Sequence, residues 1–123
     1  LKQELNSKRL KTYKVDMGDK ESIKQFTEEY RKEFDVDIII NNAGIIQPFV
    51  KVENLEDNII DKVMNVNFFG PVNLIRYLMK DLTKDRKKQY IVNISSMGGF
   101  FPFPGQTIYG ASKAALKIFT EGL

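Results

Sequence analysis

Val36-Asp37-Ile38-Ile39-Ile40-Asn41 is the stretch that decides the fold, because it is rich in β-branched residues and almost continuously apolar. A strand with one solvated face alternates apolar and polar residues, whereas a run of this kind is typical of a parallel strand covered on both faces. Tyr90 to Ser95 repeats the pattern, and the shorter run Thr12 to Asp16 predicts a further strand. We therefore expect a parallel sheet with helices packed on it.

The segments between these runs have the periodicity of helices. Apolar residues recur at spacings of three and four after Asp19, which suits an N-cap; they are Ile23, Phe26, Tyr30 and Phe34. Leu1 to Leu10 reads as the end of an earlier helix, and a last helix opens near Tyr109. The order αβαβαβα predicts right-handed crossovers in a doubly wound sheet. We find no internal repeat or linker, so residues 1–123 are interpreted as one domain.

A long helix is expected from Asn54 to about Thr83, with Asn54 and Asp57 available to cap it and charged residues Lys84 to Lys88 turning the chain after it. Its apolar residues occupy more than one stripe, so one face should pack on the sheet and another on a subunit partner. Within it, Pro71 has no N–H to donate to the carbonyl of Asn67. The sequence therefore predicts a kink that leaves this carbonyl available, although an ordinary kinked helix would look the same.

Composition excludes several kinds of chemistry. The 123 residues contain no Cys and no His, which removes disulfides, thiolate nucleophiles, the Ser-His-Asp triad and the usual metal ligands. The net charge of +3 is small and the basic residues are mixed with acids, so nucleic acid is a poor candidate partner. No apolar run approaches the roughly 20 residues of a membrane span. We predict no metal, nucleic-acid or membrane partner.

Tyr109 and Lys113 lie four residues apart, which places them on one face of a helix. An ammonium group stabilises a neighbouring phenolate, so this Tyr could exchange a proton near neutral pH. Taken alone, the pair is better explained by a core-facing Tyr and a solvated Lys. Ser96 favours the chemical interpretation of the pair, because it stands at the end of the run Tyr90 to Ser95 and precedes Tyr109 by thirteen residues.

Three polar positions follow the predicted strands: Asp16, Asn41-Asn42-Ala43-Gly44 and Ser96. Ligands of open parallel sheets bind beyond the carboxyl ends of the strands, so these positions should line one crevice. Gly44 would allow a sharp turn and a close approach of a ligand to the backbone. Asp16 has two readings, as a ligand contact or as a simple turn cap.

Together these motifs resemble the short-chain dehydrogenase/reductase family over nearly the whole chain. Asn41 to Gly44 is similar to the family's Asn-Asn-Ala-Gly signature, and Tyr109 with Lys113 to its Tyr-x-x-x-Lys motif. Asn67 and Ser96 resemble its active-site Asn and Ser, and Asp16 its adenine-contacting Asp. The family's Gly-rich Thr-Gly-x-x-x-Gly-x-Gly turn and its C-terminal part are missing. The resemblance thus implies an incomplete Rossmann-like domain with three αβα layers.

The resemblance implies an NAD- or NADP-dependent enzyme that interconverts a carbonyl and an alcohol. Tyr109 would be the general acid and base, Ser96 would donate a hydrogen bond to the substrate carbonyl, and Lys113 would hold the nicotinamide ribose. The main-chain oxygen of Asn67 would hold a water of the proton relay, and Asn42, Ala43, Gly44 and Asp16 would contact the cofactor. The alternative is a dinucleotide-sensing or interaction protein on the same scaffold without turnover.

Expected partners are a small carbonyl or alcohol substrate and further copies of the chain. Three Phe in the loop Met97 to Gly105 suggest an apolar substrate, but the same rings could pack beneath the loop or at a subunit contact. By resemblance, the long helix and the Tyr109 helix would pair in a cytoplasmic homodimer or homotetramer.

The resembling fold has the strand order 3-2-1-4-5-6, and the three runs correspond to the third, fourth and fifth strands. Thr12 to Asp16 would then have no partner strand, and one face of Val36 to Ile40 would stay uncovered. We therefore expect that residues 1–123 alone neither fold stably nor bind a dinucleotide.

Overall fold

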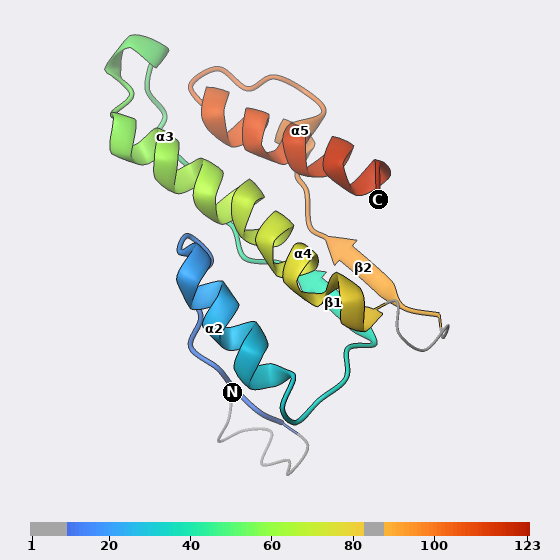
Figure 1. Ribbon diagram of the computed structural model, residues 1–123. Helices are drawn as coiled ribbons and strands as arrows, with labels where there is room; N and C mark the ends of the chain where they lie inside the picture. Colours follow the sequence, from blue (N-terminus) through green and yellow to red (C-terminus); the bar gives the residue numbers. More distant parts are fainter. Residues whose placement is uncertain (1–9, 83–87) are drawn as a thin grey trace.

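The computed structural model describes residues 10–82 and 88–123 as a small parallel sheet with helices packed beside it (Figure 1). The helix expected for Leu1 to Leu10 and the turn at Lys84 to Lys88 therefore lie almost entirely outside the described residues. The elements in order are α2 (Lys20–Tyr30), β1 (Ile38–Asn41), the 3-10 turn η1 (Val52–Asn54), α3 (Asp57–Met64), the π-helical turn η2 (Asn65–Phe69), α4 (Gly70–Leu82), β2 (Tyr90–Asn93), the 3-10 turn η3 (Met97–Gly99) and α5 (Thr107–Glu121).

The two long apolar runs form the parallel pair that was predicted. β1 lies beside β2 with Ile38 opposite Tyr90 and Asn41 opposite Asn93, and the crossover between them is made by α3 and α4. The strand predicted at Thr12 to Asp16 is wrong: in the described part of the chain the sheet has only β1 and β2. A strand needs a neighbour to pair its backbone groups, and residues 12–16 have none there. The Asp16 amide instead donates to the Ser22 hydroxyl at 2.9 Å.

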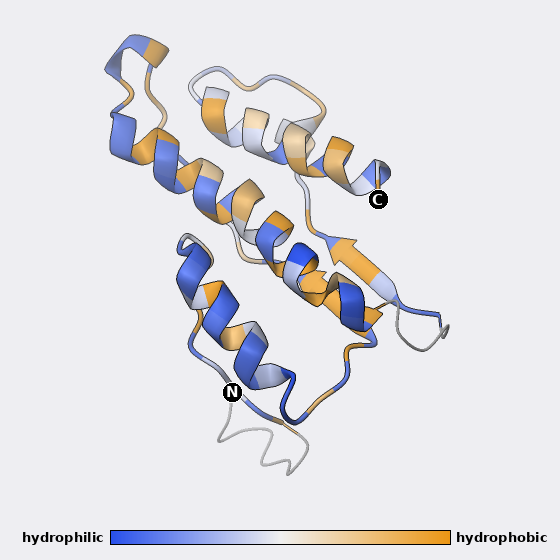
Figure 2. Ribbon diagram, viewed as in Figure 1, coloured by the Kyte–Doolittle hydropathy of each residue, from blue (hydrophilic) through white to orange (hydrophobic). Residues whose placement is uncertain are grey.

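Among residues 10–82 and 88–123, helices cover one face of the sheet and leave the other open. On that face Val36 and Ile39 form a buried core with Leu78 and Leu82 of α4. On the other face Ile38 and Ile40 are 57% and 63% exposed, although both strands are strongly hydrophobic (Figure 2). Within the described residues, the coverage on both faces that the run predicts is therefore not found, as expected if the covering elements are not among them.

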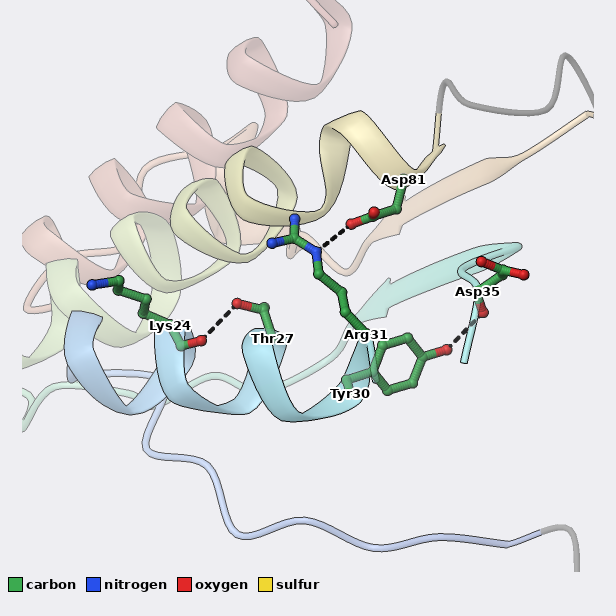
Figure 3. Close-up of polar contacts among 6 residues, drawn as sticks. All are labelled: Lys24, Thr27, Tyr30, Arg31, Asp35 and Asp81. Carbon is green, nitrogen blue, oxygen red and sulfur yellow. Dashed lines mark hydrogen bonds and ion pairs between the residues drawn. The ribbon is translucent and has the colours of Figure 1, made fainter. Parts of the chain in front are cut away.

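Helix α2 begins as predicted, with the Asp19 side chain accepting from the amide of Glu21. Its far end is tied to two other segments (Figure 3): Arg31 pairs with Asp81 of α4, and the Tyr30 hydroxyl donates to the carbonyl of Asp35 at 2.9 Å. Partial burial, and then the nearby negative charge of Asp37, raise the pKa of Tyr30 above its ordinary value. These contacts fix α2 against α4 beside the strand β1.

The predicted long helix is interrupted. Asn54 ends the turn η1, and α3 starts at Asp57 after Glu56, so the prediction of an Asn54 cap is wrong. The helix is irregular at η2, where the Gly70 amide donates to the carbonyl of Asn65, directly before Pro71. This agrees with the break that the missing proline N–H predicts. No helix within residues 10–82 or 88–123 combines the length and apolar character needed to cross a membrane.

Candidate active site

The turn η3 brings the Ser96 end of β2 directly onto helix α5. A Cβ added to Gly99 would lie 2.9 Å from the carbonyl carbon of Lys113, and one added to Gly110 would lie 2.9 Å from the carbonyl oxygen of Gly98. Such an approach is open only to residues without a side chain. The Tyr109 ring packs beside Gly98, where an added Cβ would lie 3.3 Å from its Cε1. The turn that Ser96 caps therefore lies beside the Tyr109 ring.

Ser96 caps η3, with its Oγ accepting from the Gly98 amide at 3.2 Å. A hydroxyl that accepts one hydrogen bond still has its own hydrogen to donate. The adjacent Ser95 hydroxyl donates to the carbonyl of Lys113 at 3.1 Å. The two serines therefore have separate tasks: Ser95 holds α5, and Ser96 keeps a donor for another group.

Lys113 of α5 is buried against the end of β2 and the loop after β1. Its side chain reaches the end of β2, where Nζ donates to the carbonyl of Ile94 at 2.9 Å, and the residue is 4% exposed. Burial lowers the pKa of Lys113 below its ordinary value. A Cβ on Gly44 would lie 3.2 Å from Nζ, so Gly44 and Lys113 are neighbours. Gly44, which follows β1, and the Lys113 ammonium, which reaches the residues after β2, therefore meet beyond the carboxyl ends of the two strands.

The Asn67 side chain has a role that the sequence analysis missed. It is fully buried; its Oδ1 accepts from the Ile45 amide at 2.8 Å, and its Nδ2 donates to the carbonyl of Ile45 at 2.8 Å and to the Ser112 hydroxyl at 3.0 Å. From the sequence, a role was predicted only for the main-chain oxygen of Asn67. Asn inside a helix was the available signal, because a poor helix former in that position suggests a side-chain task.

Gln47 is a second residue that sequence reasoning missed. It is 2% exposed, and its Oε1 accepts from the amides of Ile108 and Tyr109 at 2.8 and 2.9 Å. Its Nε2 donates to the carbonyl of Gly105 at 3.0 Å, and Gln106 returns a bond from Nε2 to the Gln47 carbonyl at 2.9 Å. A Gln in a loop carries no sequence signal for this, since its partners lie about sixty residues away.

The other residues predicted to contact the cofactor are Asn42, Ala43 and Asp16. Asn42 and Ala43 are exposed beside Gly44. The hydrogen bonds of Asp16 are local: its Oδ1 accepts from the Gly18 amide at 2.8 Å, the arrangement of a turn cap. Asp16 also borders a polar hollow of about 380 Å³ between the start of α2 and α3, which none of Gly44, Ser96, Tyr109 and Lys113 lines.

The Phe-rich loop forms a separate hollow of about 400 Å³ against the outer side of α5. Its rings are not packed beneath the loop, because Phe100 and Phe101 are 60% and 62% exposed. Gln106, Thr107, Gly110, Ala111 and Ala114 complete the lining, and neither Ser96 nor Tyr109 belongs to it. Among the described residues there is no group of three or more Asp, Glu, His or Cys that could hold a metal ion.

The sequence is similar to a known protein family and to curated relatives. A family model described as short chain dehydrogenase matches residues 1–123. The chain is 34% identical over 110 residues to a 3-oxoacyl-[acyl-carrier-protein] reductase of Thermotoga maritima, covering 89% of this chain and 44% of that protein.

Two solved structures superpose closely. One is 4-hydroxyisoleucine dehydrogenase complexed with NADH, with 35% identity and a TM-score of 0.83 over 92% of this chain and 50% of that one. The other is ElxO with NADP bound, with 31% identity and a TM-score of 0.82 over 89% and 44%. The chain thus spans half or less of each of these three proteins, and its parallel pair with flanking helices is an incomplete Rossmann-like fold. By its whole-length family match and its fold, the chain belongs to the short-chain dehydrogenase family.

Proposed function

We propose that these residues belong to an NAD- or NADP-dependent oxidoreductase that interconverts a carbonyl and an alcohol, with Tyr109 as general acid and base. The observation that carries the proposal is the meeting of three segments. Gly44 lies against the Lys113 ammonium, and Tyr109, one helical turn before Lys113, packs beside the turn that Ser96 opens. These contacts support the proposal, because they join the segments that carry a proton donor, a second hydroxyl donor and a buried cation.

Tyr109 and Ser96 would act on the substrate oxygen. In reduction, the Tyr109 hydroxyl gives its proton to the developing alkoxide, and in oxidation the phenolate takes it back. The Ser96 hydroxyl donates to the same oxygen, because its Oγ is already oriented by the Gly98 amide. Positioned donors of this kind stabilise charge without having to reorganise during the reaction.

Lys113 would act on both Tyr109 and the cofactor. An ammonium group has three donors, and Lys113 spends one on the carbonyl of Ile94. The others remain for a ribose hydroxyl and a relay water.

The residues after β1 fit a dinucleotide. Asn42 and Ala43 are exposed, and Gly44 has no Cβ beside Lys113, so a ligand can approach the backbone there. When bound, NAD(H) or NADP(H) supplies the hydride. Asn42, Ala43 and Gly44 would hold it, with Asp16 as a further contact for its adenine. The proteins of similar structure bind NADH in one case and NADP in the other, so both cofactors belong in the test.

The full-length protein containing these residues should reduce carbonyl compounds with NADH or NADPH. We would follow nicotinamide absorbance with a panel of aldehydes and ketones that includes apolar members, because Phe100, Phe101 and Phe103 are exposed on the loop that joins Ser96 to Tyr109. Tyr109→Phe should lower kcat by roughly 10²–10⁴-fold, the usual contribution of a general acid. Tyr90→Phe is the matched control, since Tyr90 is exposed on the open face of the sheet.

Equal rates for wild type and Tyr109→Phe would refute the role of Tyr109. Tight cofactor binding without turnover of any panel compound would instead favour a dinucleotide-sensing or interaction protein.

We further propose that the protein is a homodimer or homotetramer that uses the α3–α4 region and α5. Both present large apolar side chains to solvent, among them Phe69 and Ile118. Sedimentation of the full-length protein at micromolar concentration should show the oligomer; a monomer alone would contradict this.

A further inference from the structure

Helix α5 lacks a cap of its own at the end that carries Tyr109. The first amides of a helix have no intrahelical acceptor and need one from elsewhere. The N-cap residue Gln106 makes no side-chain capping bond, and the first regular bond runs from the Gly110 amide to the Gln106 carbonyl. The amides of Ile108 and Tyr109 therefore depend on a group outside the helix.

Gln47 supplies that group from the loop after Gly44. One carboxamide oxygen accepts from both amides, at 2.8 Å from Ile108 and 2.9 Å from Tyr109. Its Nε2 donates to the carbonyl of Gly105, so the Gln47 side chain spans the junction between the Phe-rich loop and the helix. The bond from Gln106 Nε2 to the Gln47 carbonyl closes the contact in the opposite direction.

The two peptide groups of Tyr109 are tied to the same loop. Its amide reaches Gln47 directly, and its carbonyl accepts from the Ser112 hydroxyl at 2.7 Å. That hydroxyl in turn accepts from Asn67 at 3.0 Å, and Asn67 holds both backbone groups of Ile45. Tyr109 is thus fixed from both sides to residues 45–47, immediately after the segment that would hold the cofactor.

We propose that Gln47 is a positioning residue: its carboxamide caps α5 from outside and so sets Tyr109 relative to the Gly44 segment. The catalytic consequence rests on the proposed function of Tyr109, whereas the capping itself does not. Displacing a reacting group by about 1 Å costs up to roughly 10²-fold in rate, so loss of the cap should be visible in turnover.

The first experiment measures amide exchange in the full-length protein, with residue resolution at Ile108 and Tyr109. Both amides should be protected in wild type, which first-turn amides ordinarily are not. Gln47→Met keeps the length of the side chain but loses its oxygen, and should speed exchange at these two sites by about tenfold or more. Gln47→Glu keeps an oxygen acceptor for both amides at the positive helix end and should retain most of the protection, because only the bond from Nε2 to the Gly105 carbonyl is lost. Gln25→Met, at an exposed position on α2, is the matched control.

The second experiment measures kcat of the same variants with the best carbonyl compound of the panel and cofactor deuterated at C4. Gln47→Met should lower kcat by about ten- to a hundredfold with an unchanged KM for cofactor, and should raise the deuterium isotope effect, because the chemical step becomes slower. Gln47→Glu should recover most of the loss. A general loosening of the fold would not be rescued in this way.

The outcomes separate the two proposals. Unchanged exchange at Ile108 and Tyr109 in Gln47→Met overturns the cap. Faster exchange with kcat within twofold of wild type, in a protein that Tyr109→Phe inactivates, overturns the positioning role. Equal kcat values for wild type and Tyr109→Phe refute the proposed role of Tyr109, while exchange still decides the cap. If Gln47→Met fails to fold, failure of Gln47→Glu to protect the two amides overturns the proposal.

Discussion

The loop after Gly44 and the open face of the sheet differ in whether their side chains find partners within the described residues. At the loop, the buried side chains of Gln47 and Asn67 find their partners within the chain. On the open sheet face, which we define as Ile38, Ile40, Tyr90, Val92 and Ile94, large side chains lie 41% to 63% exposed. Contiguous exposed apolar surface of this kind marks a place for another element. The site thus has much of its local order in this chain, whereas the sheet needs covering from outside it.

The largest expected effect concerns the stability of residues 1–123 when the sheet face is left uncovered. Residues 1–123 expressed alone should show no cooperative thermal transition and no micromolar binding of NAD(H) or NADP(H), because the uncovered sheet face removes much of the apolar burial that stabilises a domain. The full-length protein should show both. Calorimetry would measure the thermal transition and nicotinamide fluorescence the binding. A sharp transition in the isolated chain would contradict the expectation that the sheet needs further covering.

Replacing Asn67 tests the loop side. Asn67→Leu leaves the amide and carbonyl of Ile45 buried without partners, so the full-length protein should lose about 3 kcal/mol of unfolding free energy. Denaturant titration measures the loss. Asn58→Leu, on the exposed side of α3, is the control and should change stability by less than about 0.5 kcal/mol. Similar values for both variants would show that the Asn67 bonds add little.

Replacing Ile40 tests whether the open sheet face is covered in the complete protein. If it is, Ile40→Ser should cost the full-length protein about 2 kcal/mol, the value of burying an aliphatic side chain. Val52→Ser, at an equally exposed residue of η1, should have little effect. A neutral Ile40→Ser in the full-length protein would mean that the face stays open to solvent.

The smallest effect is the pH dependence that Lys113 brings. Burial lowers its pKa below the ordinary 10.5, so between the lowered pKa and 10.5 the unfolded chain binds more protons than the folded one. Wild-type stability should therefore rise as pH increases through this window, and Lys113→Met should lack that rise. Unfolding midpoints of full-length protein between pH 7 and 10 would measure it. Lys117→Met, on the same helix, should keep the wild-type trend; an identical trend in Lys113→Met would contradict the assignment.

The sequence by itself determined the elements whose signals are local. Continuous apolar runs specified β1 and β2 as parallel strands, Asp19 specified the start of α2, and Pro71 specified the irregular turn before it. The motif residues Gly44, Ser96, Tyr109 and Lys113 could be proposed from the sequence, and the structure places Gly44 against Lys113 and Tyr109 beside the turn that Ser96 caps. Their types and spacings carry chemistry that can be recognised without coordinates.

Only the tertiary structure decided the features that depend on distant partners. Thr12 to Asp16 has the composition of a strand, and the resemblance implied only that it would lack a partner; the structure shows that it forms no strand among the described residues and that the Asp16 amide donates to Ser22 instead. Gln47 and the Asn67 side chain have their roles through bonds to residues 22 to 62 positions away. Side-chain hydrogen bonds at such separations leave no periodicity in the sequence, so packing alone shows that a loop glutamine caps the helix of Tyr109.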